Sequence, residues 1–227
     1  MPEFDAVLFD LDGTLCESTQ SETTIYEGAF AYAGVDPVGM PGDLWAALDG
    51  PPDPEDEHGY LAAGFERVLA AHGRPEAADP DALAAGFLDT VEHGAVAFLP
   101  GAEDALAAAG DAGSTGLVTN GPRHRQAPKV ETLALAEVMD TLVYAGDMAR
   151  RKPHPDPFDR ATGELGVAPE RALYVGNSVE FDVAGAHAAG LSAAWLRSRA
   201  DDAPGADHDP EFVLETMADL REVLRRD

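Results

Sequence analysis

Short apolar runs, separated by stretches with helical spacing, recur along much of the chain. The first lies at residues 6–9 and ends in Asp10. Near-continuous apolar runs of this length are typical of strands buried on both faces, as in a parallel sheet. The pattern therefore predicts strands at residues 6–9, 116–118, 142–144, 172–175, 193–196 and 212–214.

Helical segments separate most of these strands. Asp156-Pro157 is a favourable helix start, because Asp caps a helix and Pro fits its first turn. Strands that alternate with helices predict an α/β protein with a doubly wound parallel sheet and a Rossmann-like core. The predicted helices lie at residues 103–109, 156–165, 180–189 and 217–226, with a polar loop at residues 201–210.

The stretch from residue 18 to residue 97 breaks the alternation, because it has helical periodicity and no strand pattern. Asp79-Pro80 marks a helix start, and the prolines within residues 50–54 break the chain between helices. Two of its helices carry their apolar residues on one face, Leu61, Phe65, Val68 and Leu69 in the first and Leu83, Phe87, Leu88 and Val91 in the second. The predicted domains are an inserted α-helical domain at residues 18–97 and a core domain formed by residues 1–17 and 98–227.

The charge balance of the chain is extreme, since 42 Asp and Glu residues against 15 Lys and Arg give a formal net charge of −27. Such a surface repels nucleic acids and anionic membranes, so neither is an expected partner. The acids are spread along a chain that is 45% apolar, which favours a folded protein over a disordered one. Acid excess with only two lysines resembles proteins of salt-loving archaea, and an ordinary acidic cytosolic protein is the alternative.

Targeting and redox signals are few. No run of about 18 apolar residues occurs, so we expect no membrane span. A basic-then-apolar leader is absent from the start of the chain, which makes a signal peptide an unfavoured interpretation. Cys16 is the only cysteine, which excludes an internal disulfide and suits a reducing cytosol. We therefore expect a cytoplasmic protein, and the sequence makes no prediction of its oligomeric state.

Two aspartates directly follow the first predicted strand, in the run Asp10-Leu11-Asp12-Gly13-Thr14. Side chains two apart on an extended chain point the same way, so Asp10 and Asp12 would face one site. Carboxylates this close repel unless a cation or a shared proton lies between them. Mg²⁺ is the usual hard cation where phosphate is bound. For this motif alone, an acidic turn at a strand end is the alternative interpretation.

Thr119-Asn120-Gly121 ends the second predicted strand. A hydroxyl and free backbone amides at the carboxyl end of a strand can hold an anion, and ligands of open α/β sheets bind at that edge. An ordinary Asn-Gly turn is the alternative.

Further polar residues follow the later strands. Lys152 lies in a turn at residues 150–155, and its compact ammonium could neutralise a phosphate and a nucleophile together. Asn177 ends another strand, and Asp182 on the helix after it could complete a metal site. The structural alternatives are a solvated basic turn for Lys152 and an acid that favours the helix dipole for Asp182.

These motifs arrive in order at strand ends, and together they closely resemble the haloacid dehalogenase superfamily, which consists mostly of phosphatases. The matching segments are residues 8–15, 118–121, 151–153 and 175–178 with Asp182, and the resemblance covers essentially the whole chain. The helical insertion between the first and second motifs resembles the first cap type of that superfamily.

The resemblance implies an Mg²⁺-dependent phosphatase that hydrolyses a small phosphate monoester through an aspartyl-phosphate. Asp10 would be the nucleophile and a metal ligand. Asp12 would be the general acid and base, and its backbone carbonyl would also bind the metal. Thr119 would bind the phosphoryl group, together with the amides of Asn120 and Gly121.

The remaining motif residues would complete the site. Lys152 would stabilise the nucleophile and the transferred phosphoryl group, and Asn177 and Asp182 would lie at or beside the metal. Asn177 departs from the family pattern, because many metal-dependent members have an acid there. An amide oxygen still coordinates, but without the charge.

Other reactions of the superfamily fit less well. Hydrolytic dehalogenation needs neither a metal nor an acid for an alkoxide leaving group, and that branch lacks the second aspartate, whereas Asp12 is present here. Phosphonoacetaldehyde hydrolysis requires a cap lysine, and none occurs between residues 18 and 97. A non-catalytic binding protein of the same fold is a third alternative. The only Lys or Arg residues of the insertion are Arg67 and Arg74, which weakly disfavours phosphoglycolate as substrate because its carboxylate needs a positive partner. Arg123 and Arg125, after the second motif, are an alternative source of that partner.

Overall fold

In the computed structural model, which describes residues 4–49, 56–197 and 209–225, all six predicted strands form and pair in one parallel sheet. Their order across the sheet is β5-β4-β1-β6-β7-β8. The strands are β1 (Ala6–Phe9), β4 (Ser114–Thr119), β5 (Thr141–Tyr144), β6 (Ala172–Gly176), β7 (Ser192–Leu196) and β8 (Phe212–Leu214). The predicted doubly wound α/β core is therefore confirmed.

Strand β1 is central, with β4 on one side and β6 on the other. Its four residues are buried and alternate between two clusters of side chains, Val7 and Phe9 on one face and Ala6 and Leu8 on the other. Such alternation explains why the strand is apolar throughout, since both faces of the sheet are covered. The strand order reverses at β1, which makes the carboxyl ends of β1, β4 and β6 the ligand edge of this fold.

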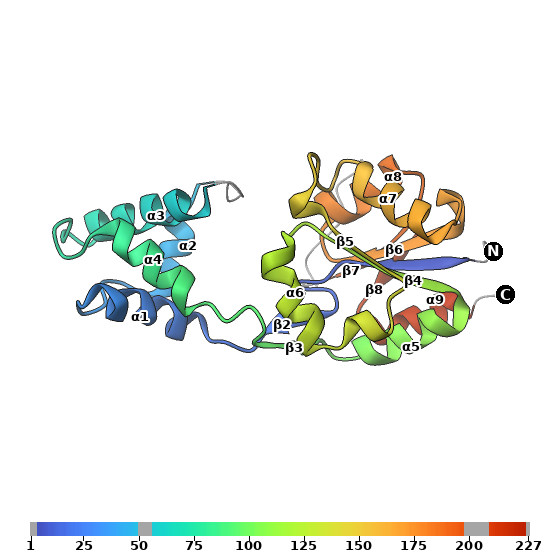
Figure 1. The fold of residues 1–227 in the computed structure, drawn as a ribbon, viewed down its shortest axis with the longest axis horizontal. Helices are drawn as coiled ribbons and strands as arrows, with labels where there is room; N and C mark the ends of the chain where they lie inside the picture. The colour runs from blue at the N-terminus through green and yellow to red at the C-terminus, as the bar shows by residue number, and fades with distance from the viewer. Residues whose placement is uncertain (1–3, 50–55, 198–208, 226–227) are drawn as a thin grey trace. The chain divides into compact units, whose positions relative to one another are not determined.

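Helices cover both faces of the sheet (Figure 1). On one face α5 (Ala102–Ala112) packs against β1, β4 and α9 (Leu220–Leu224). On the other lie α7 (Asp156–Leu165) and α8 (Ala184–Ala188). The predicted helix at residues 180–189 is a π-helical turn at Val179–Val183 that leads into α8. Short 3₁₀ turns lie at Leu135–Glu137, Ala145–Asp147, Pro169–Arg171 and Met217–Asp219.

Two parts of the core were not predicted. Helix α6 (Arg123–Thr132) follows β4. Only two of its residues are buried, Gln126 and Val130, and because one of them is polar the sequence has no apolar stripe. An antiparallel ribbon joins β2 (Cys16–Ser18) to β3 (Val96–Phe98). The prediction that residues 18–97 contain no strand was therefore wrong at both ends, because three-residue strands are too short to show an alternating pattern.

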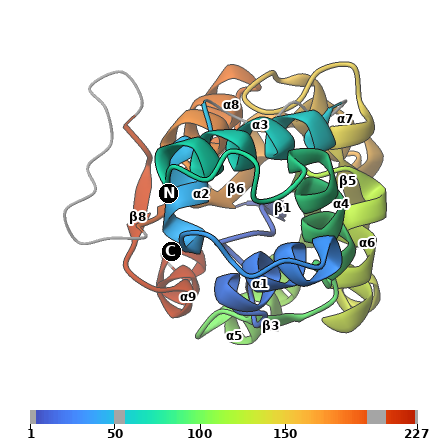
Figure 2. The same ribbon diagram turned by 90° about the vertical axis from the view of Figure 1, so that its left-hand side faces the viewer.

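The chain divides into two compact units, the core unit (Met1–Ser18 and His93–Asp227) and the helical unit (Thr19–Glu92). In the helical unit α4 (Pro80–Thr90) packs against α1 (Glu22–Ala33) and α3 (Glu57–Ala71), and α2 (Pro41–Ala47) packs against α3 (Figure 2). Aromatic rings of Tyr26, Phe30, Phe65 and Phe87 meet in its interior.

The helix start that the sequence predicts in this unit is capped as expected. The Asp79 carboxylate accepts a hydrogen bond from the Asp81 amide, with Pro80 in the first turn. Of the predicted apolar faces, Leu88 and Val91 are partly buried and the other members are buried. The predicted break at residues 50–54 and most of the predicted loop at residues 201–210 lie outside the described residues.

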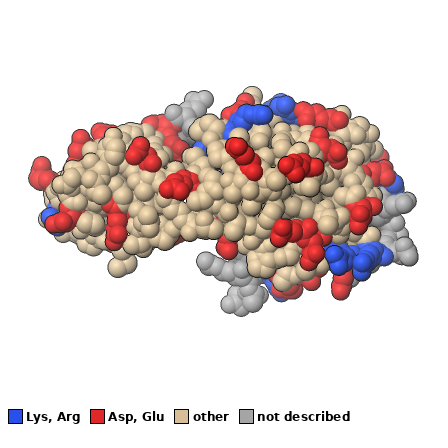
Figure 3. Space-filling view, turned by 60° about the horizontal axis from the view of Figure 1, so that its bottom comes forward, with Lys and Arg blue, Asp and Glu red and all other residues tan. Residues whose placement is uncertain are grey.

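Two surface properties bear on partners. Asp and Glu side chains are scattered over the face shown in Figure 3 and do not gather in one patch. Among the described residues, none of the helices combines the length and the apolar composition needed to span a bilayer.

Candidate active site

Asp10 lies directly beyond the carboxyl end of β1, at the edge where β4 and β6 also end. Its backbone amide donates to the Val175 carbonyl at 2.9 Å, so the chain still follows β6 at this point. The residue after it, Leu11, is buried, whereas Asp12 is exposed. The first motif therefore places one aspartate inside the molecule and the next at its surface.

Lys152 is buried beside Asp10 and uses all three donors of its ammonium group. Its Nζ donates to Asp10 Oδ1, Asp182 Oδ1 and the Tyr174 hydroxyl, each at 2.7 Å. The Tyr174 hydroxyl in turn donates to the Val118 carbonyl at 2.8 Å. An ammonium with three satisfied donors is held in one position, so the Lys152 charge is fixed against the Asp10 carboxylate.

Burial and charge act in opposite directions on these groups. Burial raises the pKa of Asp10 to about 6, against the effect of Lys152, and the nearby Asp182 adds to the rise. Burial alone would lower the pKa of Lys152, but the carboxylates of Asp10 and Asp182 outweigh it and raise that pKa above its ordinary value. Lys152 is therefore charged, and it is the positive centre of the site.

The loop that carries Lys152 is held by Asn120. The side-chain amide of Asn120 donates through Nδ2 to the Lys152 carbonyl at 3.0 Å, and its Oδ1 accepts from the Lys152 backbone amide at 2.8 Å. Asp182 is held from its other oxygen, because Oδ2 accepts from the Ser178 amide at 2.9 Å. Asn120 and Asp182 thus act on the position of Lys152 from two sides.

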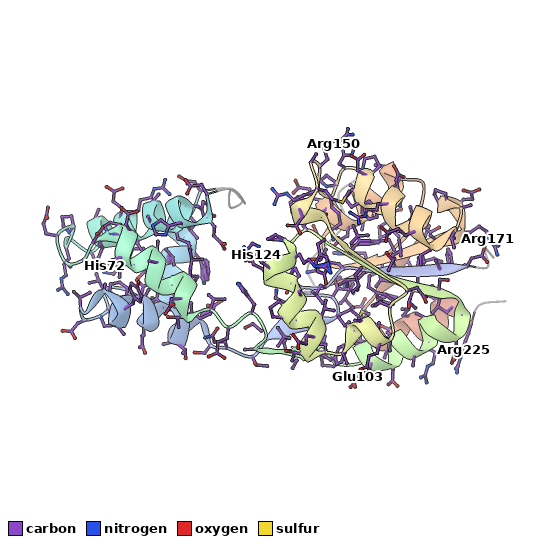
Figure 4. All side chains as sticks on the ribbon, in the orientation of Figure 1. His72, Glu103, His124, Arg150, Arg171 and Arg225 are labelled. Atoms are coloured by element: carbon purple, nitrogen blue, oxygen red, sulfur yellow. The ribbon has the colours of Figure 1, made fainter. Side chains whose placement is uncertain are left out.

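A second set of contacts surrounds Asp12. Gln126 Nε2 donates to Asp12 Oδ2 at 2.8 Å and to Thr119 Oγ1 at 2.9 Å. Lys129 Nζ forms an ion pair with Asp12 Oδ1 at 2.6 Å. Both donors come from neighbouring turns of α6, whose first turn carries the exposed His124 (Figure 4). Helix α6 therefore connects the first motif with the end of β4.

Asn177 lies against the turn that follows Asp12. Thr14 Oγ1 donates to Asn177 Oδ1 at 3.3 Å. Gly13 has a φ of 74°, and a Cβ atom there would lie 2.6 Å from Asn177 Nδ2. The close approach and the left-handed backbone both require glycine at this position.

The oxygen atoms at this edge are of the kind that a magnesium site would need. The Asp10 carboxylate, the Asp12 backbone carbonyl and the Asn177 amide oxygen are hard donors, which Mg²⁺ prefers, and they would be its ligands. No group of three His, Cys, Asp or Glu side chains within the described residues is arranged for a metal, so such a site would need the two neutral donors and water beside Asp10. The site also has three carboxylates against two ammonium groups, an excess of negative charge that favours a cation.

Comparison with known proteins identifies the family of the chain. The family model for haloacid dehalogenase-like hydrolases matches residues 4–190. The chain belongs to this family. An N-acetylmuramic acid 6-phosphate phosphatase from Pseudomonas aeruginosa is 30% identical, over 97% of this chain and 95% of the relative. A phosphoglycolate phosphatase from Salmonella typhimurium is also 30% identical, over 96% of this chain and 91% of the relative. The solved 2-haloacid dehalogenase from Pseudomonas syringae is 26% identical with a TM-score of 0.67, and the match covers 97% and 98% of the two chains.

In this haloacid dehalogenase-like hydrolase, the structure brings the predicted residues to one edge of the sheet. Asp10, Lys152 and Asp182 share direct contacts, and Asp12 and Thr119 are linked through Gln126. Asn177 lies at the first motif through Thr14 and Gly13. The predicted Gly121 lies against Gln126, and Asn120 contacts the backbone of Lys152.

Sequence reasoning missed three residues of the site, Gln126, Lys129 and Tyr174. A signal was available for Lys129, since Lys129 and Lys152 are the only lysines of the chain and each therefore stands out in it. Gln126 lies three residues before Lys129, the spacing that places both on one helix face. Tyr174 gave no signal, because an aromatic residue in a buried strand is an ordinary core residue.

Proposed function

We propose that this hydrolase is an Mg²⁺-dependent phosphatase that cleaves a small phosphate monoester through an aspartyl-phosphate on Asp10. The observation that carries the proposal is the buried Lys152 ammonium, 2.7 Å from the Asp10 carboxylate at the ligand edge of the sheet. Phosphoryl transfer depends mainly on positioning and on neutralising charge. A carboxylate nucleophile beside a fixed cation supplies both.

The chemistry proceeds in two steps. A carboxylate oxygen of Asp10 attacks phosphorus, the ester P–O bond breaks, and the leaving oxygen takes a proton from the carboxyl of Asp12. Asp12 then takes a proton from water, the hydroxide attacks the aspartyl-phosphate, and inorganic phosphate leaves with Asp10 regenerated. Thr119 and the amides of Asn120 and Gly121 would bind the phosphoryl oxygens, and Lys152 would stabilise their charge in both steps.

Mg²⁺ would be held by Asp10, the Asp12 carbonyl and Asn177. When bound, it would neutralise charge on the phosphoryl oxygens. Both oxygens of Asp182 already accept hydrogen bonds, from Lys152 and Ser178, so Asp182 would lie beside the metal and add negative charge there. Asp182 also keeps Lys152 in place for the nucleophile.

A small phosphate monoester is the substrate class that the comparisons and the chain support. The two phosphatase relatives are named for different esters, and both named substrates carry a carboxylate as well as the phosphate group. Arg67 of the helical unit forms an ion pair with Asp49 and donates to the Ala47 carbonyl. That unit is therefore poor in cations that could bind a carboxylate of the substrate. We further propose that the helical unit is the cap domain of the enzyme and that the enzyme is cytoplasmic.

A panel of phosphate esters, with Mg²⁺ or with EDTA in molar KCl, tests this proposal. We expect phosphate release from at least one ester with Mg²⁺, and none with EDTA. Asp10→Asn should lower the rate by several powers of ten, roughly the share that nucleophilic catalysis supplies. If that variant kept more than a few per cent of the turnover, the aspartyl-phosphate mechanism would be wrong. Halide release from a 2-haloacid, without phosphate release, would favour a dehalogenase.

A further inference from the structure

Gln126 is a buried polar side chain in α6, a helix in which Val130 is the only other buried residue. It is 4% exposed, and its amide nitrogen lies between groups from two separate motifs. One N–H donates to Asp12 Oδ2 and the other to Thr119 Oγ1. Both donors of the amide are therefore used, each on a residue that the proposed function assigns to the reaction.

The backbone next to the phosphate-binding residue makes room for this amide. A Cβ atom on Gly121 would lie 2.3 Å from Gln126 Nε2 and 2.5 Å from its Cδ. Gly121 is not in the left-handed region, so its own backbone does not require glycine. Close packing of the Gln126 side chain is the local reason for glycine at the end of the second motif.

The acceptor end of the same amide has no partner. Gln126 Oε1 is the one buried side-chain polar atom without a hydrogen bond among the described residues. A buried acceptor left unsatisfied is costly, so a leucine would be the more stable residue unless the two donors serve another purpose. The opposite orientation of the amide would place Oε1 against the Asp12 carboxylate, where two acceptors repel. The contacts with Asp12 and Thr119 therefore fix the amide in one orientation.

We propose that Gln126 is a positioning residue that holds the carboxyl of Asp12 beside the hydroxyl of Thr119. The inference rests on the proposed function. Because Gln126 donates into the Thr119 oxygen, the proton of that hydroxyl points elsewhere and is available to a phosphoryl oxygen. The same amide holds Asp12 Oδ2, so the group that protonates the leaving oxygen is aligned with the group that binds the phosphate. The Lys129 ammonium donates to the other oxygen of Asp12, a contact that does not make this connection.

The test compares two esters that differ in their need for a general acid. Nitrophenolate leaves p-nitrophenyl phosphate without protonation, whereas the alkoxide of glycerol 3-phosphate must be protonated. The measured quantity is kcat/KM, which covers the steps through departure of the leaving group. The proteins are the full chain, Asp12→Asn, Gln126→Leu and Gln126→Glu, in molar KCl with Mg²⁺. Gln126→Glu preserves size and places a like charge beside Asp12.

We expect Gln126→Leu to lower kcat/KM for glycerol 3-phosphate by about 100-fold, within the range of general acid catalysis, and for p-nitrophenyl phosphate by less than about 10-fold. Gln126→Glu should show the same selective loss, and it keeps the test decisive if the leucine variant does not fold. Equal losses with both esters would overturn the inference, because a structural role lowers both in proportion to the folded enzyme. If Asp12→Asn is selective and the Gln126 variants are not, only the positioning role falls. If Asp12→Asn is itself unselective, the general acid assignment fails and this inference fails with it.

Discussion

Asp12 and Asp182 form lysine ion pairs of nearly equal length in very different surroundings. The N–O distances are 2.6 Å and 2.7 Å, but the side chain of Asp12 is 51% exposed and that of Asp182 only 3%. Replacing each with asparagine removes one negative charge from a net charge of −27. The general repulsion therefore changes equally in both variants, and the difference in stability isolates the effect of burial.

The expected magnitudes follow from the contacts. Both oxygens of Asp182 accept, from Lys152 and from Ser178, so in Asp182→Asn one of these two donors would face the NH₂ group of the new amide in either orientation. Breaking a buried pair costs about 3–5 kcal/mol, and the lower end applies because Lys152 keeps Asp10 and Tyr174. In Asp12→Asn the amide oxygen can still accept from the buried Gln126, so the contact that is lost is the exposed pair with Lys129, worth about 0–1 kcal/mol. For a chain of this size, about 3 kcal/mol corresponds to a fall in Tm of roughly 6–12 °C.

Urea and thermal unfolding of the wild type and the two variants, with EDTA in molar KCl, measure this difference. Chelation matters because bound metal would stabilise the folded state and mask the effect. We expect Asp182→Asn to be less stable than Asp12→Asn by at least about 2 kcal/mol, the gap between a buried and an exposed pair. Equal losses in the free energy of unfolding would refute the argument that burial sets the strength of these pairs.

Three further predictions concern salt, the metal and the cysteine. Screening at about 1 M salt shortens the Debye length to about 3 Å, so Tm should rise steeply between dilute and molar KCl, and a flat Tm would end the halophile interpretation. Asn177→Asp should lower the Mg²⁺ concentration for half-maximal activity, because a carboxylate binds Mg²⁺ better than an amide, and an unmoved titration curve would take Asn177 out of the metal site. Cys16 is fully buried, and burial raises the pKa of its thiol to about 12. Iodoacetamide at about pH 8 should therefore label the unfolded protein and spare the folded one, and rapid labelling of the native enzyme would contradict the buried position of Cys16.

The core sheet was predictable from the sequence because its strands are buried on both faces. A strand such as Ala172–Gly176 needs apolar residues at every position, which produces a run that stands out against a polar chain. Residues directly after such runs lie at one edge of a parallel sheet, so Asp10 and Asn177 could be placed together without coordinates. The order of motifs then identified the family.

Features without an apolar pattern could not be predicted in this way. Helix α6 buries Gln126 through hydrogen bonds and carries Pro128 in its interior, so its sequence lacks both the stripe and the composition of a helix. Strands β2 and β3 pair although the whole inserted unit separates them in the sequence, and each is too short, at three residues, to show an alternating pattern. The Asp12 contacts depend on α6, which is why Gln126 and Lys129 were missed together.

The ribbon of β2 and β3 has a consequence for the history of this chain. The helical unit leaves the core after Ser18 and rejoins it at His93, and Ser18 pairs directly with Val96, so the two connections enter one pair of strands. A turn of a few residues would close the same ribbon, and each unit has its own buried apolar cluster. The helical unit can therefore be lost, replaced or exchanged for another sequence in evolution without opening the sheet, and the residues at the strand ends can be inherited intact.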